Sequence, residues 1–81
     1  MAAIALQTDT IWLRPNYQVA PLNPRLSSRL PELKRALEAG VIAYPDMNRS
    51  GFYDIELPGG WAYVHVRDDN QTIYLVAYSR D

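Results

Sequence analysis

Cysteine is absent from the 81-residue chain, and His65 is its only histidine. Without cysteine there is no disulfide framework, no thiol nucleophile and no zinc site built on cysteine. Lys34 is the only lysine among eight basic residues, and the net charge of −1 gives no general attraction to phosphate backbones. These absences leave no pattern that predicts a metal centre or a cofactor, and we expect none.

Long apolar runs are also missing. The apolar start, MAAIAL, is too short to span a bilayer and has no positive flank before it. We therefore expect a cytoplasmic location and no membrane partner. Hydrophobic residues make up 48% of the chain and charged residues 21%, which are ordinary globular proportions, and the length allows one domain with a small core.

The chain divides at about residue 25. Residues 1–25 combine a short strand-like run with several prolines and predict an N-terminal strand or arm. Leucines then recur at helical spacing, at Leu26, Leu30, Leu33 and Leu37. Because Pro31 cannot occupy a helix interior, the regular helix is expected over Pro31–Ala39, after a looser turn capped by Asn23. Gly40 is the expected C-cap.

Residues after the helix alternate as strands and predict an antiparallel meander. With Gly59-Gly60 as a two-residue turn, the expected pairs are Ile55 with Val64, Tyr53 with Val66 and Leu57 with Ala62. With Asp68–Gln71 as the second turn, they are Val66 with Ile73, Val64 with Leu75 and Ala62 with Ala77. Both registers place aliphatic residues on one face. The predicted fold is α+β: residues 26–81 form a helix packed on one face of a three-stranded antiparallel meander.

The reverse face of this meander is rich in aromatic residues. The same registers place there Phe52, Trp61, Tyr63, Tyr74 and Tyr78, together with Arg67. A solvated sheet face is normally polar, so we expect the N-terminal arm, a second copy of the chain or another protein to cover it. Tyr, Trp, Phe and Arg dominate protein interfaces. The sequence therefore predicts a small non-catalytic interaction module that binds a protein partner, or forms a homodimer, through this face.

A catalytic alternative rests on His65, which the predicted register places between Asp54 and Tyr74. A neighbouring aspartate orients an imidazole as a general base, and Glu56 and Arg67 are expected nearby. The simpler interpretation of the same residues is a cross-strand ion pair in a half-buried sheet.

The order of strand, helix and meander, with the segments FYDIEL, WAYVHV and TIYLVAYSR, resembles the small RelE/ParE toxins. The resemblance covers about residues 26–80. For members that cleave mRNA on the ribosome, it implies Arg, His, Tyr and Glu side chains of the meander as working groups. The resemblance also implies RNA and the ribosome as the binding partners.

An oxygen-rich loop precedes the meander. Asp46, Asn48 and Ser50 stand at the first, third and fifth positions of a calcium-loop pattern, Gly51 at the sixth and Asp54 at the ninth. Leu57 occupies the twelfth position, where such loops carry an acid. The same residue types are typical of a polar turn, and a turn is the prediction, with Asp46, Asn48 and Ser50 as a weak candidate metal set.

Overall fold

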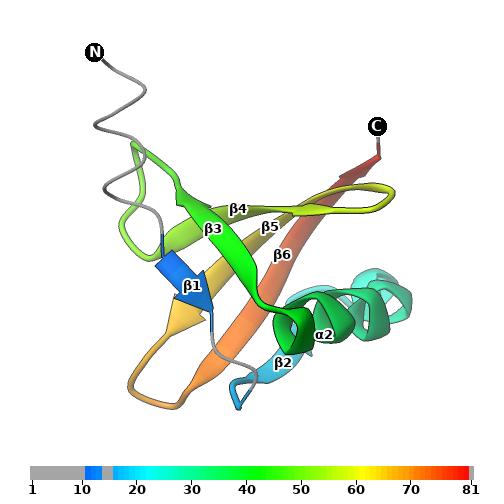
Figure 1. Ribbon diagram of the computed structural model, residues 1–81, viewed down its shortest axis with the longest axis horizontal. Coiled ribbons are helices and arrows are strands. Elements are labelled where there is room, and N and C mark those ends of the chain that lie inside the picture. The colour runs from blue at the N-terminus through cyan, green and yellow to red at the C-terminus, as the bar shows by residue number, and fades with distance from the viewer. Residues whose placement is uncertain (1–10, 14–15, 81) are drawn as a thin grey trace.

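The computed structural model describes residues 11–13 and 16–80, which form one mixed sheet with a helical segment against it. The strands are β1 (Ile11–Leu13), β2 (Gln18–Pro21), β3 (Val41–Pro45), β4 (Phe52–Leu57), β5 (Gly60–Arg67) and β6 (Thr72–Arg80). The helices are η1 (Pro24–Arg29), a 3₁₀ helix, and α2 (Leu30–Ala39). Figure 1 shows η1 and α2 beside β2, and the β4–β5 and β5–β6 turns at opposite ends of the sheet.

The helical segment begins and ends as its sequence predicts. The Asn23 side chain accepts a hydrogen bond from the Arg25 backbone N–H, which caps η1. The α-helix starts at Leu30, one residue before the expected position, and Gly40 ends it with φ = 85°. Leu33 and Leu37 are fully buried, and the earlier leucines of the stripe pack against the same core.

The α+β class is confirmed. The sheet, however, is larger than the three-stranded antiparallel meander that the sequence predicts, and it contains both parallel and antiparallel pairs. Its strand order is β1-β3-β4-β5-β6-β2. β2 runs parallel to β6 at one edge, and β1 pairs antiparallel with β3 at the other. Residues 11–13 and 18–21 therefore add edge strands. The strand prediction missed β3, although Val41–Tyr44 is a β-prone run bounded by Gly40 and Pro45.

The β4–β5 hairpin keeps the predicted faces but not the predicted pairs. Ile55 lies opposite Ala62, not Val64, because the turn is Pro58-Gly59 and Gly60 already belongs to β5. Pro58 has no N–H to offer a ladder and suits the turn. Gly60 pairs with Arg80 of β6, and this position requires glycine because a Cβ there would collide with the Ser79 carbonyl oxygen. The two-residue shift preserves the alternation of side chains.

The β5–β6 hairpin confirms the predicted turn and the first two predicted pairs, Val66 with Ile73 and Val64 with Leu75. The third, Ala62 with Ala77, is wrong because Val76 is an extra residue on β6, a β-bulge. Beyond the bulge Tyr78 pairs with Ala62 and turns to the helix-covered face. There its hydroxyl lies 3.4 Å from a Glu32 carboxylate oxygen.

The core lies between α2 and one face of the sheet. Its fully buried larger side chains are Leu33, Leu37, Ile55, Val64, Ile73 and Leu75. The predicted contact of the leucine stripe with the aliphatic face is therefore confirmed. No residue of η1 or α2 belongs to the opposite face, which is called the open face below and is described next.

Candidate partner-binding face

The open face carries the side chains of β3–β6 that point away from α2. Its large residues are Tyr44, Phe52, Trp61, Tyr63, His65, Tyr74 and Val76, joined by Leu22 after β2. Leu22 is 64% exposed, Tyr44 43% and Trp61 36%. Within residues 16–80 the only helices pack on the other face, so these apolar surfaces are open to contact.

Aromatic rings cross the centre of the open face in a row. The ring of Phe52 stacks on His65 at 4.3 Å between centroids and on Tyr63 at 5.6 Å. His65 and Tyr74 lie opposite each other in the β5–β6 ladder, with centroids 6.4 Å apart. The guanidinium carbon of Arg49 lies 3.8 Å above the Phe52 ring, a cation–π contact. These contacts hold the rings in place from three strands and a loop.

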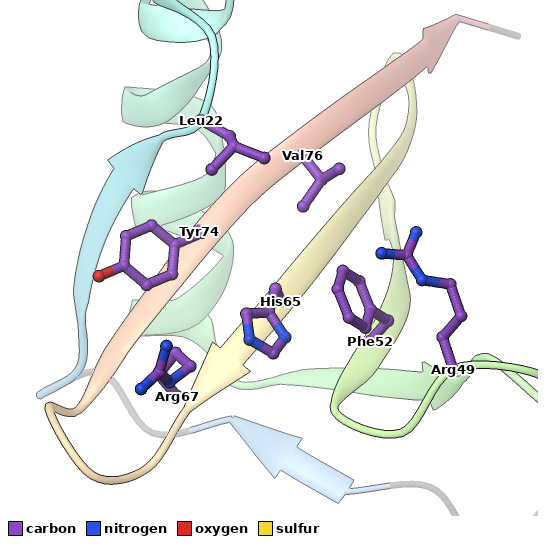
Figure 2. A pocket seen from close by; sticks show the side chains of 7 residues that line it. All are labelled: Leu22, Arg49, Phe52, His65, Arg67, Tyr74 and Val76. Carbon is purple, nitrogen blue, oxygen red and sulfur yellow. The ribbon is translucent and has the colours of Figure 1, made fainter.

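A shallow hollow of about 240 Å³ opens at this row. We call it the basic hollow; its lining is Leu22, Arg49, Phe52, His65, Arg67, Tyr74 and Val76. Figure 2 shows Arg49 beside Phe52 on one side and Arg67 near Tyr74 on the other, with Leu22 and Val76 as apolar wall. No carboxylate belongs to this lining. The hollow therefore favours an apolar group that carries negative charge.

His65 has a defined orientation in the hollow. Its Nδ1 lies 3.1 Å from the Gly51 carbonyl oxygen, and because a carbonyl can only accept, Nδ1 carries the proton that is donated. In the neutral ring Nε2 is then the acceptor. Gly51 has φ = 85°, and a Cβ there would come within 3.3 Å of the His65 ring. This glycine allows the loop to approach the imidazole closely.

Asp54 does not orient His65, contrary to the predicted row. Asp54 lies opposite Tyr63, and Phe52 takes the expected place beside His65, because of the shifted β4–β5 register. Burial raises the pKa of Asp54, and the negative charge of Asp46 raises it further. The expected Asp–His pair is therefore absent from the site.

Asp46 holds the loop that leads into β4. Its carboxylate accepts hydrogen bonds from the Asn48 backbone N–H, at 2.9 Å, and from the Tyr63 hydroxyl. The bond from Tyr63 is the main cause that lowers the pKa of Asp46, and it raises the pKa of Tyr63. The predicted turn is confirmed, since the Asp46 N–H donates to the Phe52 carbonyl at 2.8 Å and closes the loop. Within the described ranges, 11–13 and 16–80, no group of three His, Asp or Glu side chains could hold a metal ion.

A second region of the open face is aromatic and acidic. We call it the acidic corner; it consists of Tyr44, Asp54, Glu56 and Trp61. Glu56 pairs with Trp61 across the ladder, and Tyr44 pairs with Asp54. The rings of Tyr44 and Trp61 are 6.2 Å apart and tilted by 59°. The open face thus has a basic half and an acidic half.

The structure places most, but not all, of the predicted binding residues together. Phe52, Tyr63, Tyr74 and Arg67 lie in or beside the basic hollow, and Trp61 lies in the acidic corner. Tyr78 lies on the covered face, where the Arg29 guanidinium is 4.2 Å from its ring centroid.

Of the alternative catalytic set, His65 and Arg67 line the hollow, whereas Asp54 and Glu56 do not. The sequence reasoning missed Leu22 and Tyr44. The β-prone run Val41–Tyr44 was the available signal for Tyr44.

Comparison with protein-family models, with curated proteins and with solved structures gives no match to this chain. In the part of the chain that the structure describes, no helix has the length and apolarity that a membrane crossing requires. The geometry and charges of the open face are therefore the basis for a functional proposal.

Proposed function

We propose that the protein is a small non-catalytic interaction module that binds a protein partner through its open face. The observation that carries the proposal is the row of rings Phe52, His65 and Tyr74, flanked by exposed Trp61 and Leu22, on a face with no helix from residues 16–80. Folding does not require such a composition, because the core is complete on the other face. Large rings at the centre of a surface are the usual anchors of protein association.

The charges on the same face favour a protein over a nucleic acid. Arg67 forms a two-point contact with Asp69, with N–O distances of 3.1 and 2.7 Å, so its charge is partly neutralised. Asp54 and Glu56 share the face, and the whole chain has a net charge of −1. Nucleic-acid binding depends on an excess of positive charge along the contact surface. A mixed aromatic and charged surface is typical of protein interfaces.

Affinity capture with tagged variants tests the proposal. Tyr63→Ala and Tyr74→Ala each remove a ring from the central row and should abolish association, since losing a central anchor costs about 2 kcal/mol or more of binding. His65→Gln keeps a polar group of similar size and should weaken association only slightly. Tyr78→Ala is the matched control, because it makes the same truncation on the covered face.

Each variant is first checked for folding by circular dichroism. Full association by folded Tyr63→Ala and Tyr74→Ala would remove the open face from consideration. Loss by all tyrosine variants alike, Tyr78→Ala included, would also contradict the proposal, because the effect would not depend on the face.

The basic hollow favours one second candidate, ribosome-dependent cleavage of mRNA, as in the RelE/ParE toxins that the sequence resembles. Arg49 and Arg67 could neutralise a phosphate there, and Nε2 of His65 could accept a proton. Asp54 and Glu56, also in the predicted catalytic set, would act only from outside the hollow. Cleavage of mRNA on ribosomes by the wild type, lost in His65→Gln while folding is retained, would promote this candidate over the binding module.

A further inference from the structure

The two halves of the open face complement each other. The basic hollow presents Arg49 and Arg67, of which Arg67 is also held by Asp69 from outside the lining, and the acidic corner presents Asp54 and Glu56 beside two exposed rings. The hollow is smaller than the roughly 300–1,000 Å³ pockets that hold drug-sized ligands and suits one large inserted side chain. Trp61, which is 36% exposed and stands next to Glu56, is such a side chain.

We propose that the partner of the open face is a second copy of this chain, bound so that the acidic corner of each copy enters the basic hollow of the other. This inference rests on the proposed function and names its partner. A two-fold interface uses the same patch on both copies, so the two halves of that patch must complement each other in shape and charge. A surface with a basic aromatic half and an acidic aromatic half meets that condition.

The spacing along β5 defines where the two-fold axis passes. Trp61 and His65 lie on the same strand four positions apart, so about 13 Å separates them. A two-fold axis that lies parallel to the sheet above the open face, runs roughly perpendicular to β5 and is midway between them passes over Tyr63. Rotation about it carries Glu56 of one copy toward Arg67 of the other, and the reverse contact forms at the same time. Tyr63 then faces its own counterpart at the centre of the interface.

The surface is large enough for such a contact. A standard interface buries about 800 Å² on each partner. The described chain has 5478 Å² of accessible surface and extents of 39 × 31 × 25 Å, so one broad face can supply this area. Two such sheets would pack face to face at the usual spacing of about 10 Å, with the rings between them.

A charge exchange tests this arrangement. Arg67→Glu and Glu56→Arg are both at exposed positions, and each alone places like charges at both junctions of the two-fold dimer. Each should raise the dimer dissociation constant at least about tenfold. Mixing the two variants restores opposite charges at both junctions of a mixed dimer, and combining both changes in one chain restores them in a homodimer. Arg35→Glu and Glu38→Arg on α2 are the matched controls.

Sedimentation equilibrium over a concentration series gives the mass, with folding checked by circular dichroism. The wild type and the controls should have twice the 9.2 kDa chain mass. Each single variant should be mostly monomer, and the mixture and the double variant should be dimeric again. A monomeric wild type at every concentration would overturn it. So would single variants that remain dimeric, or a mixture that stays monomeric. A monomeric wild type that still captures another protein, with loss in Tyr74→Ala, would overturn the second copy but leave the proposed function standing.

Discussion

The two faces of the sheet are built on the same strands, but their residue compositions have different physical explanations. On the covered face Ile55, Val64 and Leu75 are fully buried against α2, as a folding core requires. On the open face the alternate positions carry stacked rings and charges, including Phe52 and Tyr63. A sheet face that only meets water would be polar throughout. Folding therefore accounts for the first face, and the partner contact proposed above would account for the second.

The largest expected difference between the faces comes from placing a carboxylate on each. Val64→Asp puts an unpaired charge at the centre of the covered face and should cost roughly 4 kcal/mol or more, enough to unfold a domain of this size. Tyr63→Asp, on the neighbouring residue, should cost only about 1–2 kcal/mol. Thermal unfolding followed by circular dichroism measures both. Equal losses of melting temperature would mean that the open face is buried within the molecule itself.

Two aspartates on the open side should respond to pH in opposite ways. The Tyr63 hydrogen bond lowers the pKa of Asp46, so ionised Asp46 stabilises the fold above its ordinary pKa of 3.8, and this contribution is lost as the pH falls through the lowered value. Burial raises the pKa of Asp54, so its ionisation costs stability as the pH rises above 3.8.

At neutral pH, Asp46→Asn should therefore lower the melting temperature and Asp54→Asn should raise it slightly. The Asp54 difference should shrink as the pH falls through its raised pKa toward 3.8. The Asp46 difference should shrink as the pH falls from 3.8 through its lowered pKa, below which both carboxyl groups are protonated in the folded and unfolded chain. Melting temperatures measured at intervals of about one pH unit, from about pH 2 to about pH 7, would follow both differences. Differences that persist unchanged at the acidic end would show that the two carboxylates act through packing and not through charge.

The smallest expected effect concerns calcium. Both carboxylate oxygens of Asp46 are already engaged, by the Asn48 N–H and by the Tyr63 hydroxyl, so the loop offers little to a cation. Millimolar calcium should leave the melting temperature unchanged, because a ligand that does not bind the folded state adds no stability. A rise of several degrees that Asp46→Ala abolishes would establish a site here.

Much of the covered face could be predicted from the sequence, because alternation and leucine spacing are local signals. The stripe ending at Leu33 and Leu37 and the aliphatic strands that it meets are both read from short windows. A register error of two residues leaves each side chain on the same face of the sheet. Ile55 and Val64 were therefore assigned to the correct face, although their predicted pairing was wrong.

The open face was harder to predict because its details depend on non-local contacts. Gly60 pairs with β6, which leaves no room for a Cβ there, and the bulge at Val76 moves Tyr78 to the other face. The parallel pairing of β2 with β6, which brings Leu22 to the hollow, joins residues about 54 positions apart. A bulge and a parallel edge strand leave no periodic signal in the sequence.

Trp61 reports most directly on the central claim that the open face is a contact surface. Trp12→Phe leaves it as the sole tryptophan, since the chain has two. In complex with a second copy or with a captured protein, its emission should move to shorter wavelength and its quenching by iodide should fall, because the exposed indole becomes covered. Emission and quenching that stay unchanged when the complex has formed would contradict the account.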